Sequence, residues 1–175
     1  MNAQRVSMRV RLSVLTVTAA ALADVVLGSP SPAARQRERM QETAARRELV
    51  TAAFQWLDAT LARDFAAQSA FYPDKMEAFY LWRDVPKAAV LKEKQRVFAE
   101  AHTIDLQMEP PQILIEPGAR SGRMYFRKRY VIQGDRKLNR SGEVLQELRW
   151  AREPDGWKIT SERDLRVIRQ AKRQP

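Results

Sequence analysis

The 175-residue chain contains no cysteine and only one histidine. Without thiols it can form no disulfide, no thiolate nucleophile and no cysteine-ligated metal site. The single histidine, His102, would need further ligands to hold a metal, and its neighbours Glu100 and Asp105 do not form a recognised ligand set. None of the six glycines belongs to a phosphate-binding loop. We therefore predict no metal site, no cofactor and no catalytic residue of these common types.

The chain also lacks a long apolar run. Its short run near the amino terminus indicates where in the cell the protein is located. Arg5, Arg9 and Arg11 precede uncharged residues 12–23, which end in Ala-Leu-Ala. This order of basic, apolar and small residues is typical of a secretory signal peptide. A transmembrane helix needs about 20 apolar residues, which this run does not reach. We expect a periplasmic or secreted bacterial protein, with an uncleaved membrane anchor as the alternative.

The rest of the chain divides by composition. Ser29-Pro30-Ser31-Pro32 reads as a linker without helix, and the following residues are rich in Arg, Gln, Glu and Ala. We expect a signal peptide at 1–23, a linker or frayed helix at 24–41, one folded domain at 42–168 and a basic tail at 169–175.

The net charge of +10 at pH 7 raises the question of an anionic partner. A basic surplus can indicate nucleic acid. An exported protein seldom meets nucleic acid, however, and here acidic residues are interspersed among the basic ones. We therefore expect no nucleic acid, but an anionic envelope ligand or an envelope protein, and membrane contact only through an uncleaved signal. A solvated basic surface without any partner is the alternative.

Two or three helices are expected before a sheet, the third being a short one between the other two. A four-three-four-four spacing predicts one amphipathic helix with an apolar stripe, and Trp56 lies off this stripe; the stripe is Val50, Phe54, Leu57, Leu61 and Phe65. Pro86 suits the first turn of a second helix, which carries Val90 and Val97. Residues 71–85 between them are expected to form a loop or short irregular segment.

Period-two alternation begins after His102 and predicts strands with a single packed face. Each of three expected strands has an apolar row interrupted by polar members: Met124, Phe126, Tyr130 and Ile132 with Lys128; Val144, Leu148 and Trp150 with Gln146; and Trp157, Ile159, Leu165 and Val167 with Ser161 and Arg163. Glu153-Pro154-Asp155-Gly156 joins the last two as a hairpin turn. Strict alternation turns Glu162 and Asp164 outward, where they could pair with Arg127, Arg129 or Arg149.

This order of elements resembles the nuclear-transport-factor-2-like, or SnoaL-like, cone fold. The residues behind the resemblance are Phe71-Tyr72-Pro73, Trp82, segments 123–131 and 142–150, and Asp155-Gly156-Trp157-Lys158-Ile159 followed by Glu162. The arrangement is similar to the version associated with bacterial L,D-transpeptidases. The resemblance implies an α+β fold in which amino-terminal helices pack in the concave face of a strongly bent antiparallel sheet, a cystatin-like roll. A homodimer through the outer sheet face is common among such proteins.

The cone of this fold implies a pocket, and the candidates for its lining follow from strand alternation. The polar residues expected inside are Lys128, Tyr130, Gln146, Ser161 and Arg163, and the aromatic residues expected at its mouth are Tyr72, Tyr80 and Trp82, with Trp56 nearby. We name Lys128, Tyr130, Gln146, Arg163, Tyr72, Tyr80 and Trp82 as ligand-binding candidates. A β-bulge that reverses the alternation would instead put the charged residues at a solvated rim.

Three functions stay open. The favoured one is a non-catalytic binding or accessory module of the cell envelope, linked to peptidoglycan or its modifying enzymes, because the expected inner face lacks an acid/base pair. The second is a SnoaL-like small-molecule enzyme of isomerase, cyclase or hydrolase type, which would need Tyr130 with Lys128, or His102, for proton transfer. The third is a structural assembly subunit with a filled cone. An open pocket should bind a ligand that carries a carboxylate, as peptidoglycan stem peptides do.

Overall fold

A computed structural model describes residues 31–135 and 138–170. The predicted signal peptide and residues 171–175 of the predicted tail lie outside them. The helices are α1 (Pro32–Leu61), α2 (Phe65–Ser69) and α3 (Lys87–Glu100), and the strands are β1 (Lys75–Phe79), β2 (Trp82–Pro86), β3 (Ala101–Met108), β4 (Gln112–Ile115), β5 (Ser121–Gly134), β6 (Arg140–Glu153) and β7 (Gly156–Gln170). None of these helices is both long and apolar enough to cross a bilayer.

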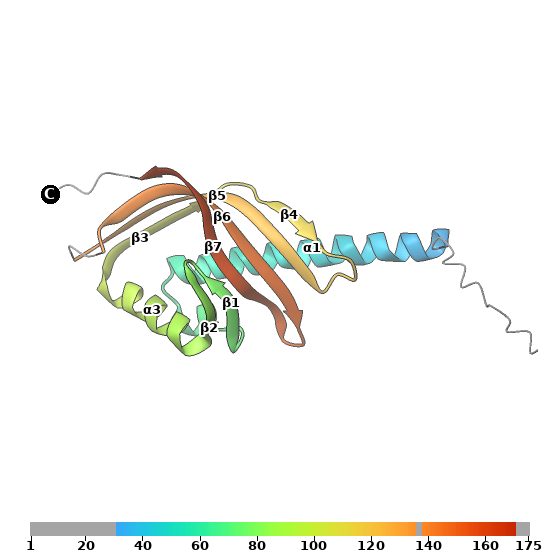
Figure 1. Ribbon diagram of the computed structural model, residues 1–175, viewed down its shortest axis with the longest axis horizontal. Coiled ribbons are helices and arrows are strands. Elements are labelled where there is room, and N and C mark those ends of the chain that lie inside the picture. The colour runs from blue at the N-terminus through green and yellow to red at the C-terminus, as the bar shows by residue number, and fades with distance from the viewer. Residues whose placement is uncertain (1–30, 136–137, 171–175) are drawn as a thin grey trace, which may run out of the picture. The chain divides into compact units, whose positions relative to one another are not determined.

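Helix α1 begins at the second proline of the expected linker. The Ser31 hydroxyl accepts a hydrogen bond from the Ala34 N–H at 3.2 Å and caps the helix. Pro32 fits the first turn because its missing N–H would have no partner there in any case. The expectation that Pro32 is non-helical is therefore wrong. Residues 31–44 are exposed, and this part of α1 extends past the sheet (Figure 1).

The buried face of α1 is rotated from the predicted stripe. Phe54 and Leu61 are 47% and 39% exposed, whereas Trp56 is only 3% exposed. The residues that share the buried face are mostly small: Ala45, Leu49, Ala52, Ala53, Trp56, Ala59 and Thr60. Alanines let the helix approach the sheet closely, and the one large ring, Trp56, fills the remaining space. The predicted stripe was wrong at Phe54 and Leu61, whereas Val50 and Leu57 pack partly buried against the core. Side-chain size, and not only hydrophobicity, selects the packed face.

The sheet has seven strands in the order β2-β1-β7-β6-β5-β3, with β4 also paired to β5. All pairs are antiparallel except β1 with β7, which is parallel, so the sheet is mixed. The α+β class is confirmed. The expected loop at 71–85 is wrong in part, because it contains the β1–β2 hairpin. Met76 and Ala78 alternate as buried residues there, a pattern too short to stand out beside Pro73 and the surrounding charges.

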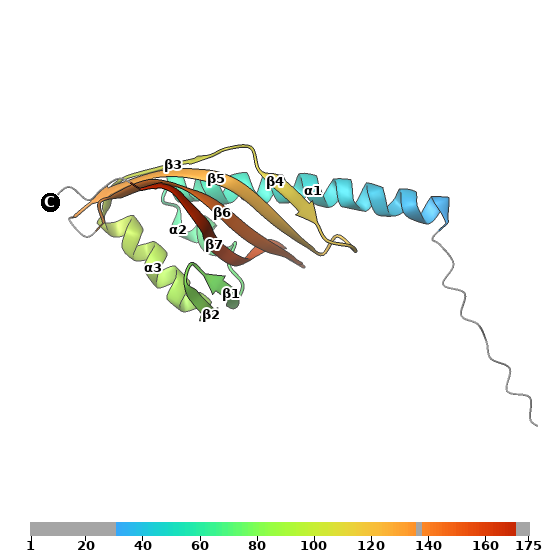
Figure 2. The same cartoon turned by 45° about the horizontal axis from the view of Figure 1, so that its top comes forward.

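The sheet curls over α2, α3 and the carboxyl-terminal half of α1, so the helices lie on its concave side (Figure 2). Phe126 and Trp157, both predicted to be core residues, are 3% and 6% exposed. The predicted second helix is confirmed as α3, with Val90 and Val97 buried on it. Gly142 leaves room for an inward ring, because a Cβ there would lie 2.9 Å from the Tyr130 hydroxyl oxygen.

A β-bulge in β7 reverses the predicted alternation. Trp150 pairs with Ile159, but Arg149 pairs with Ser161, so Thr160 is an extra residue on β7. Trp157 and Ile159 before it face the core as predicted. A second register shift skips Leu165, after which Val167 pairs with buried Val144; Leu165 and Val167 are nevertheless 42% and 59% exposed. The bulge at Thr160 thus decides the orientation of Glu162, Arg163 and Asp164.

Candidate functional site

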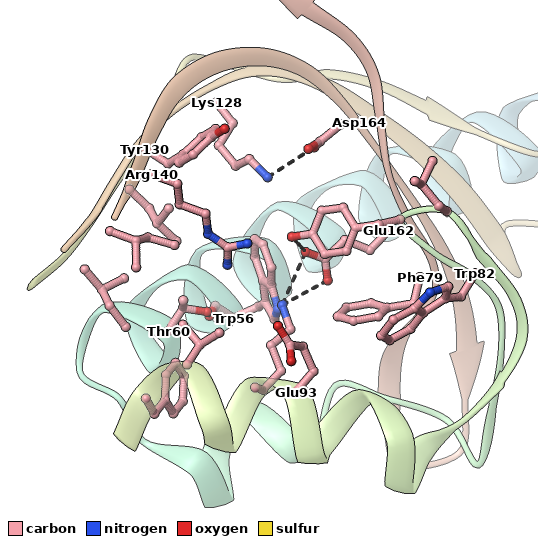
Figure 3. Close-up of a pocket in the computed structure, with 18 residues that line it drawn as sticks. Trp56, Thr60, Phe79, Trp82, Glu93, Lys128, Tyr130, Arg140, Glu162 and Asp164 are labelled. Atoms are coloured by element: carbon pink, nitrogen blue, oxygen red, sulfur yellow. Dashed lines mark hydrogen bonds and ion pairs between the residues drawn. The ribbon is translucent and has the colours of Figure 1, made fainter. Parts of the chain in front are cut away.

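A cavity of about 360 Å³ lies between the β1–β2 hairpin, α1, α3 and the concave face of the sheet (Figure 3). Most of its wall is apolar or aromatic: Trp56, Phe79, Leu81, Trp82, Val97, Phe98, Ile104, Leu106 and Ile132. The polar wall consists of Thr60, Tyr80, Glu93, Lys94, Lys128, Tyr130, Arg140, Glu162 and Asp164. Leu81 and Trp82, at the hairpin turn, are 93% and 55% exposed and border the opening.

Glu162 of β7 is the most completely satisfied charge in the cavity. It is 1% exposed and receives Lys94 Nζ on both carboxylate oxygens, at 3.3 and 3.1 Å. The Tyr80 hydroxyl donates to Oε1 at 2.7 Å, and the Tyr72 hydroxyl donates to Oε2 at 3.4 Å. Buried charges need such partners because burial removes their water. Glu162 and Lys94 therefore form one tightly bound ion pair.

Aromatic rings enclose the other half of this ion pair. Lys94 Nζ lies 5.7 Å from the Trp56 ring, 5.7 Å from the Tyr72 ring and 5.3 Å from the Phe79 ring. Cations are attracted to such ring faces within about 6 Å. The Trp56 indole N–H also donates to the Tyr72 hydroxyl at 3.1 Å. The rings thus fix Lys94, which reaches in from α3, against Glu162.

The pKa values of this group move away from neutrality. Burial alone would raise the pKa of Glu162, but Lys94, Lys128 and the Tyr80 hydrogen bond outweigh it, and the pKa is lowered. Burial alone would lower the pKa of Lys94, but the Glu162 charge outweighs it, and the pKa is raised. Burial raises the pKa of Tyr72 to about 12 and that of Tyr80 well above its ordinary value. Each group keeps its ordinary charge at pH 7.

A second polar group forms around Asp164. Lys128 Nζ and Gln146 Nε2 each donate to Asp164 Oδ1 at 3.2 Å. Lys128 Nζ also lies 5.5 Å from the Tyr80 ring and 5.7 Å from the Tyr130 ring. Burial lowers the pKa of Lys128 despite the opposing charge of Asp164. The pKa of Lys128 is lowered whereas that of Lys94 is raised. Lys128 contacts one carboxylate oxygen, whereas Lys94 contacts both oxygens of Glu162.

The comparisons with known proteins rest on structure, since no protein-family model and no curated protein matches the sequence. A provisionally named scytalone dehydratase from Novosphingobium aromaticivorans aligns with a TM-score of 0.64 and 10% identity, over 78% of this chain and 93% of that chain. A provisionally named dehydratase of the NTF2-like family from Streptomyces avermitilis aligns with a TM-score of 0.59 and 15% identity, over 70% and 95%. An NTF2-like protein with a cystatin-like fold, also from N. aromaticivorans, aligns at 0.56 and 12%, over 78% and 90%.

The chain has the NTF2-like fold. This confirms the fold that the resemblance implied, in which a bent sheet closes over helices as a cone-like α+β roll. Identities of this size carry the fold alone. What the pocket of this NTF2-like chain does must be argued from its own side chains.

The NTF2-like cone brings together four of the seven predicted site residues, since Lys128, Tyr130, Tyr80 and Trp82 line the cavity. Tyr72 and Gln146 lie one layer behind the wall, and they reach it through Glu162 and Asp164. The predicted aromatic mouth is thus divided: Trp82 is at the opening, whereas Tyr72 is 1% exposed and belongs to the core.

Arg163 was predicted to face the cavity, but the fold places it outside the cavity lining. It does not line the cavity, whereas its neighbours Glu162 and Asp164 do. The predicted orientation of all three is wrong, because the bulge at Thr160 reverses the alternation. The expected outer-face pairing is wrong as well. The partners of Arg127 and Arg129 include Glu143, and those of Arg149 are Glu147 and Glu77.

The sequence analysis missed Lys94 and Arg140, although both had a signal. Lys94 stands four residues after Val90 and three before Val97, on the same face of α3. Arg140 begins the alternating row that continues through Gly142 and Val144 to Gln146, and it pairs with inward Ile132. Neither was named as a candidate, because lysine and arginine side chains usually lie on the surface. Glu162 had no comparable signal, since nothing in the sequence marks the bulge.

His102 lies outside this cavity. Among residues 31–135 and 138–170, no three His, Cys, Asp or Glu side chains gather so as to hold a metal ion. His102 is exposed on β3 and is not a lining residue. Its backbone carbonyl accepts a hydrogen bond from Arg63 Nη2 at 2.7 Å. The chemistry of the cavity therefore belongs to its lysines, carboxylates, tyrosines and Arg140.

The shifted pKa of Glu162 predicts an acid-sensitive fold. A lowered pKa in the folded state gives stability that is present above the ordinary value of 4.5 and is lost as pH falls through the folded pKa. The raised pKa of Lys94 gives stability that is present below 10.5 and is lost only at higher pH. We expect the stability difference between wild type and a Glu162→Gln variant, measured by urea unfolding, to shrink below pH 4.5. A difference that stays constant with pH would contradict this assignment.

Proposed function

We propose that this chain is a non-catalytic binding module whose cavity takes a small, largely apolar ligand with one anionic group. The observation that carries the proposal is the charge balance inside the open cavity. Lys94 is paired with Glu162, Lys128 with Asp164, and Glu93 with Arg96 at 2.7 Å. Arg140, an exposed residue that lines the cavity, forms no ion pair in the part of the chain that the structure describes, although its charge lowers the pKa of Glu93.

The walls favour the apolar part of such a ligand. Rings and aliphatic side chains from α1, α3, β1, β3 and β5 face the space, and Trp82 borders its opening. Pockets for small molecules are commonly apolar, with a few polar groups that set the orientation. Arg140 can supply this orientation, because a guanidinium binds a carboxylate through two hydrogen bonds. A polar stem peptide matches these walls less well than an aromatic or aliphatic acid does.

Proton transfer is the weaker use of the site. A general acid or base works best when its pKa lies near the operating pH. The pKa of Glu162 is lowered and those of Tyr72 and Tyr80 are raised, so this hydrogen-bonded set is poorly matched to neutral pH. The enzyme alternative keeps some support, because two similar structures carry dehydratase names. For that alternative, Glu162 would be the base and Tyr80 its acid partner, 2.7 Å apart.

The envelope setting of this function is an inference from the amino-terminal sequence. The basic, apolar and small order of residues 1–23 supports export into the periplasm or beyond. The link to peptidoglycan or to its modifying enzymes rests on the resemblance alone. The structural assembly alternative required a filled cone, and the open cavity of about 360 Å³ does not support that alternative.

An Arg140→Met variant tests the binding proposal with anilinonaphthalene sulfonate, an aromatic anion whose fluorescence rises in apolar sites. We expect wild type to bind the dye and the variant to bind it at least about tenfold more weakly, which corresponds to about 1.4 kcal/mol. Added salt should reduce the difference in dye affinity between wild type and variant, since salt screens the attraction between Arg140 and the sulfonate. Fluorescence titration at two salt concentrations measures both effects.

Arg163→Met is the matched control, because it removes the same charge from the same sheet outside the cavity. It should leave dye affinity unchanged. Circular dichroism of each variant checks that the fold persists, since dye also binds loosened proteins. Equal affinities of wild type and Arg140→Met, or equal losses in the two arginine variants, would contradict an anion site at Arg140.

A further inference from the structure

We propose that Lys128 captures an aldehyde or ketone ligand in the cavity as a reversible imine. Its primary amine stands in the wall of an open apolar space, although the residue is only 8% exposed. The nitrogen lies between the rings of Tyr80 and Tyr130, at 5.5 and 5.7 Å from their centroids. Figure 3 shows the side chain directed into the cavity. This covalent step goes beyond the non-covalent binding proposed above and uses the same cavity.

The surroundings favour a neutral, nucleophilic amine at Lys128. Burial is the largest influence and lowers its pKa, and the nearby ammonium of Lys94 acts in the same direction. A lysine amine is activated by an apolar pocket or by a second cation, and Lys128 has both. Asp164, at 3.2 Å, and the charge of Glu162 oppose the shift, but burial outweighs them. The Asp164 carboxylate is positioned to take the proton that the ammonium must lose.

The reaction balances without an oxidant or reductant. The Lys128 ammonium gives one proton to Asp164, and the neutral amine forms a C–N bond to the carbonyl carbon. A proton moves from nitrogen to the former carbonyl oxygen, and the proton on Asp164 is returned as the C–O bond breaks. One water leaves, and a protonated imine remains beside the Asp164 carboxylate. A ligand with an aromatic or aliphatic body, a carbonyl and a carboxylate would suit Lys128, the apolar walls and Arg140 together.

Lys94 and Lys158 lack this combination. Lys94 is held by both oxygens of Glu162, and its raised pKa keeps it an ammonium. Lys158 is 7% exposed, as buried as Lys128, but its nitrogen contacts both Asp155 and the Ala70 carbonyl at 2.7 Å. Lys158 also lies outside the cavity lining. It is therefore a matched control for burial and for pairing with an aspartate.

The test treats the full chain with para-carboxybenzaldehyde and sodium cyanoborohydride, which converts an imine into a stable amine, and maps the labelled peptides by mass spectrometry. We expect Lys128 to be labelled at least about tenfold faster than exposed Lys75 or buried Lys158, because its lowered pKa leaves more of the amine neutral. Lys128→Arg keeps the positive charge and should abolish this label, whereas Lys158→Arg should retain it. Labelling of Lys128 no faster than of Lys75 and Lys158 would overturn the proposal.

A titration with para-toluate, which has the ring and carboxylate but no carbonyl, separates this inference from the binding function. Binding of toluate without selective labelling of Lys128 would reject the imine and leave the binding module standing. Selective labelling supports the imine whether or not toluate binds. If toluate does not bind and Lys128 is not selectively labelled, both the binding function and the imine are rejected. Thermal unfolding of Lys128→Arg shows whether loss of label reflects chemistry or loss of fold.

Discussion

Replacing Glu162 with glutamine is expected to lower the free energy of unfolding by about 3–5 kcal/mol. The carboxylate is 1% exposed and holds Lys94 Nζ at 3.1 and 3.3 Å. A neutral amide leaves the Lys94 ammonium buried among aromatic rings without a counter-charge. It also removes the charged acceptor of the Tyr80 hydroxyl. Urea unfolding followed by circular dichroism measures the loss.

Glu143→Gln is the control for this change. Glu143 is also buried, at 5% exposed, but it pairs on the outer face with Arg127, Arg129 and Arg169, whose side chains are 46%, 52% and 77% exposed. Solvent screens those pairs, so we expect a much smaller loss of stability than for Glu162→Gln. A Lys94→Met/Glu162→Gln double variant should lose less than the sum of its single changes, because both remove one interaction. Additive losses would contradict the coupled pair.

Truncating Phe126 to alanine should destabilise the domain by about 3–5 kcal/mol. The ring is 3% exposed in the main core between the sheet and α1, so its removal leaves a void that the surrounding strands cannot close. The midpoint of urea unfolding should fall while its slope stays the same.

Val167→Ala tests the same sheet on a residue that sequence alternation wrongly assigned to the core. Val167 is 59% exposed, so its truncation should change stability by no more than about 0.5 kcal/mol. A large loss at Val167 together with a small loss at Phe126 would contradict the inward face described here, and with it the register of β7.

The cavity residues differ in how far the sequence alone could predict them. Lys128 and Tyr130 could be predicted because β5 is regular and keeps one alternation along its cavity-facing part. Lys94 and Arg140 could have been found, since each lies in line with buried apolar residues, Lys94 with Val90 and Val97 and Arg140 with Val144. Glu162 and Asp164 could not, because their orientation depends on one extra residue, Thr160, whose insertion costs little locally and is decided by how β7 fits β6.

The sequence by itself determined the α+β class, the order of helices before sheet, the hairpin at Asp155-Gly156 and the core positions Phe126 and Trp157. These follow from local rules, in which periodicity and turn chemistry act over a few residues. Only the tertiary structure decided the packed face of α1, the hairpin within residues 71–85 and the pairing of Lys94 with Glu162. Those depend on space and charge contributed by segments far apart in the chain, such as Lys94 and Glu162, which are 68 residues apart. Burial makes such contacts strong, and no local pattern can record which distant partner satisfies them.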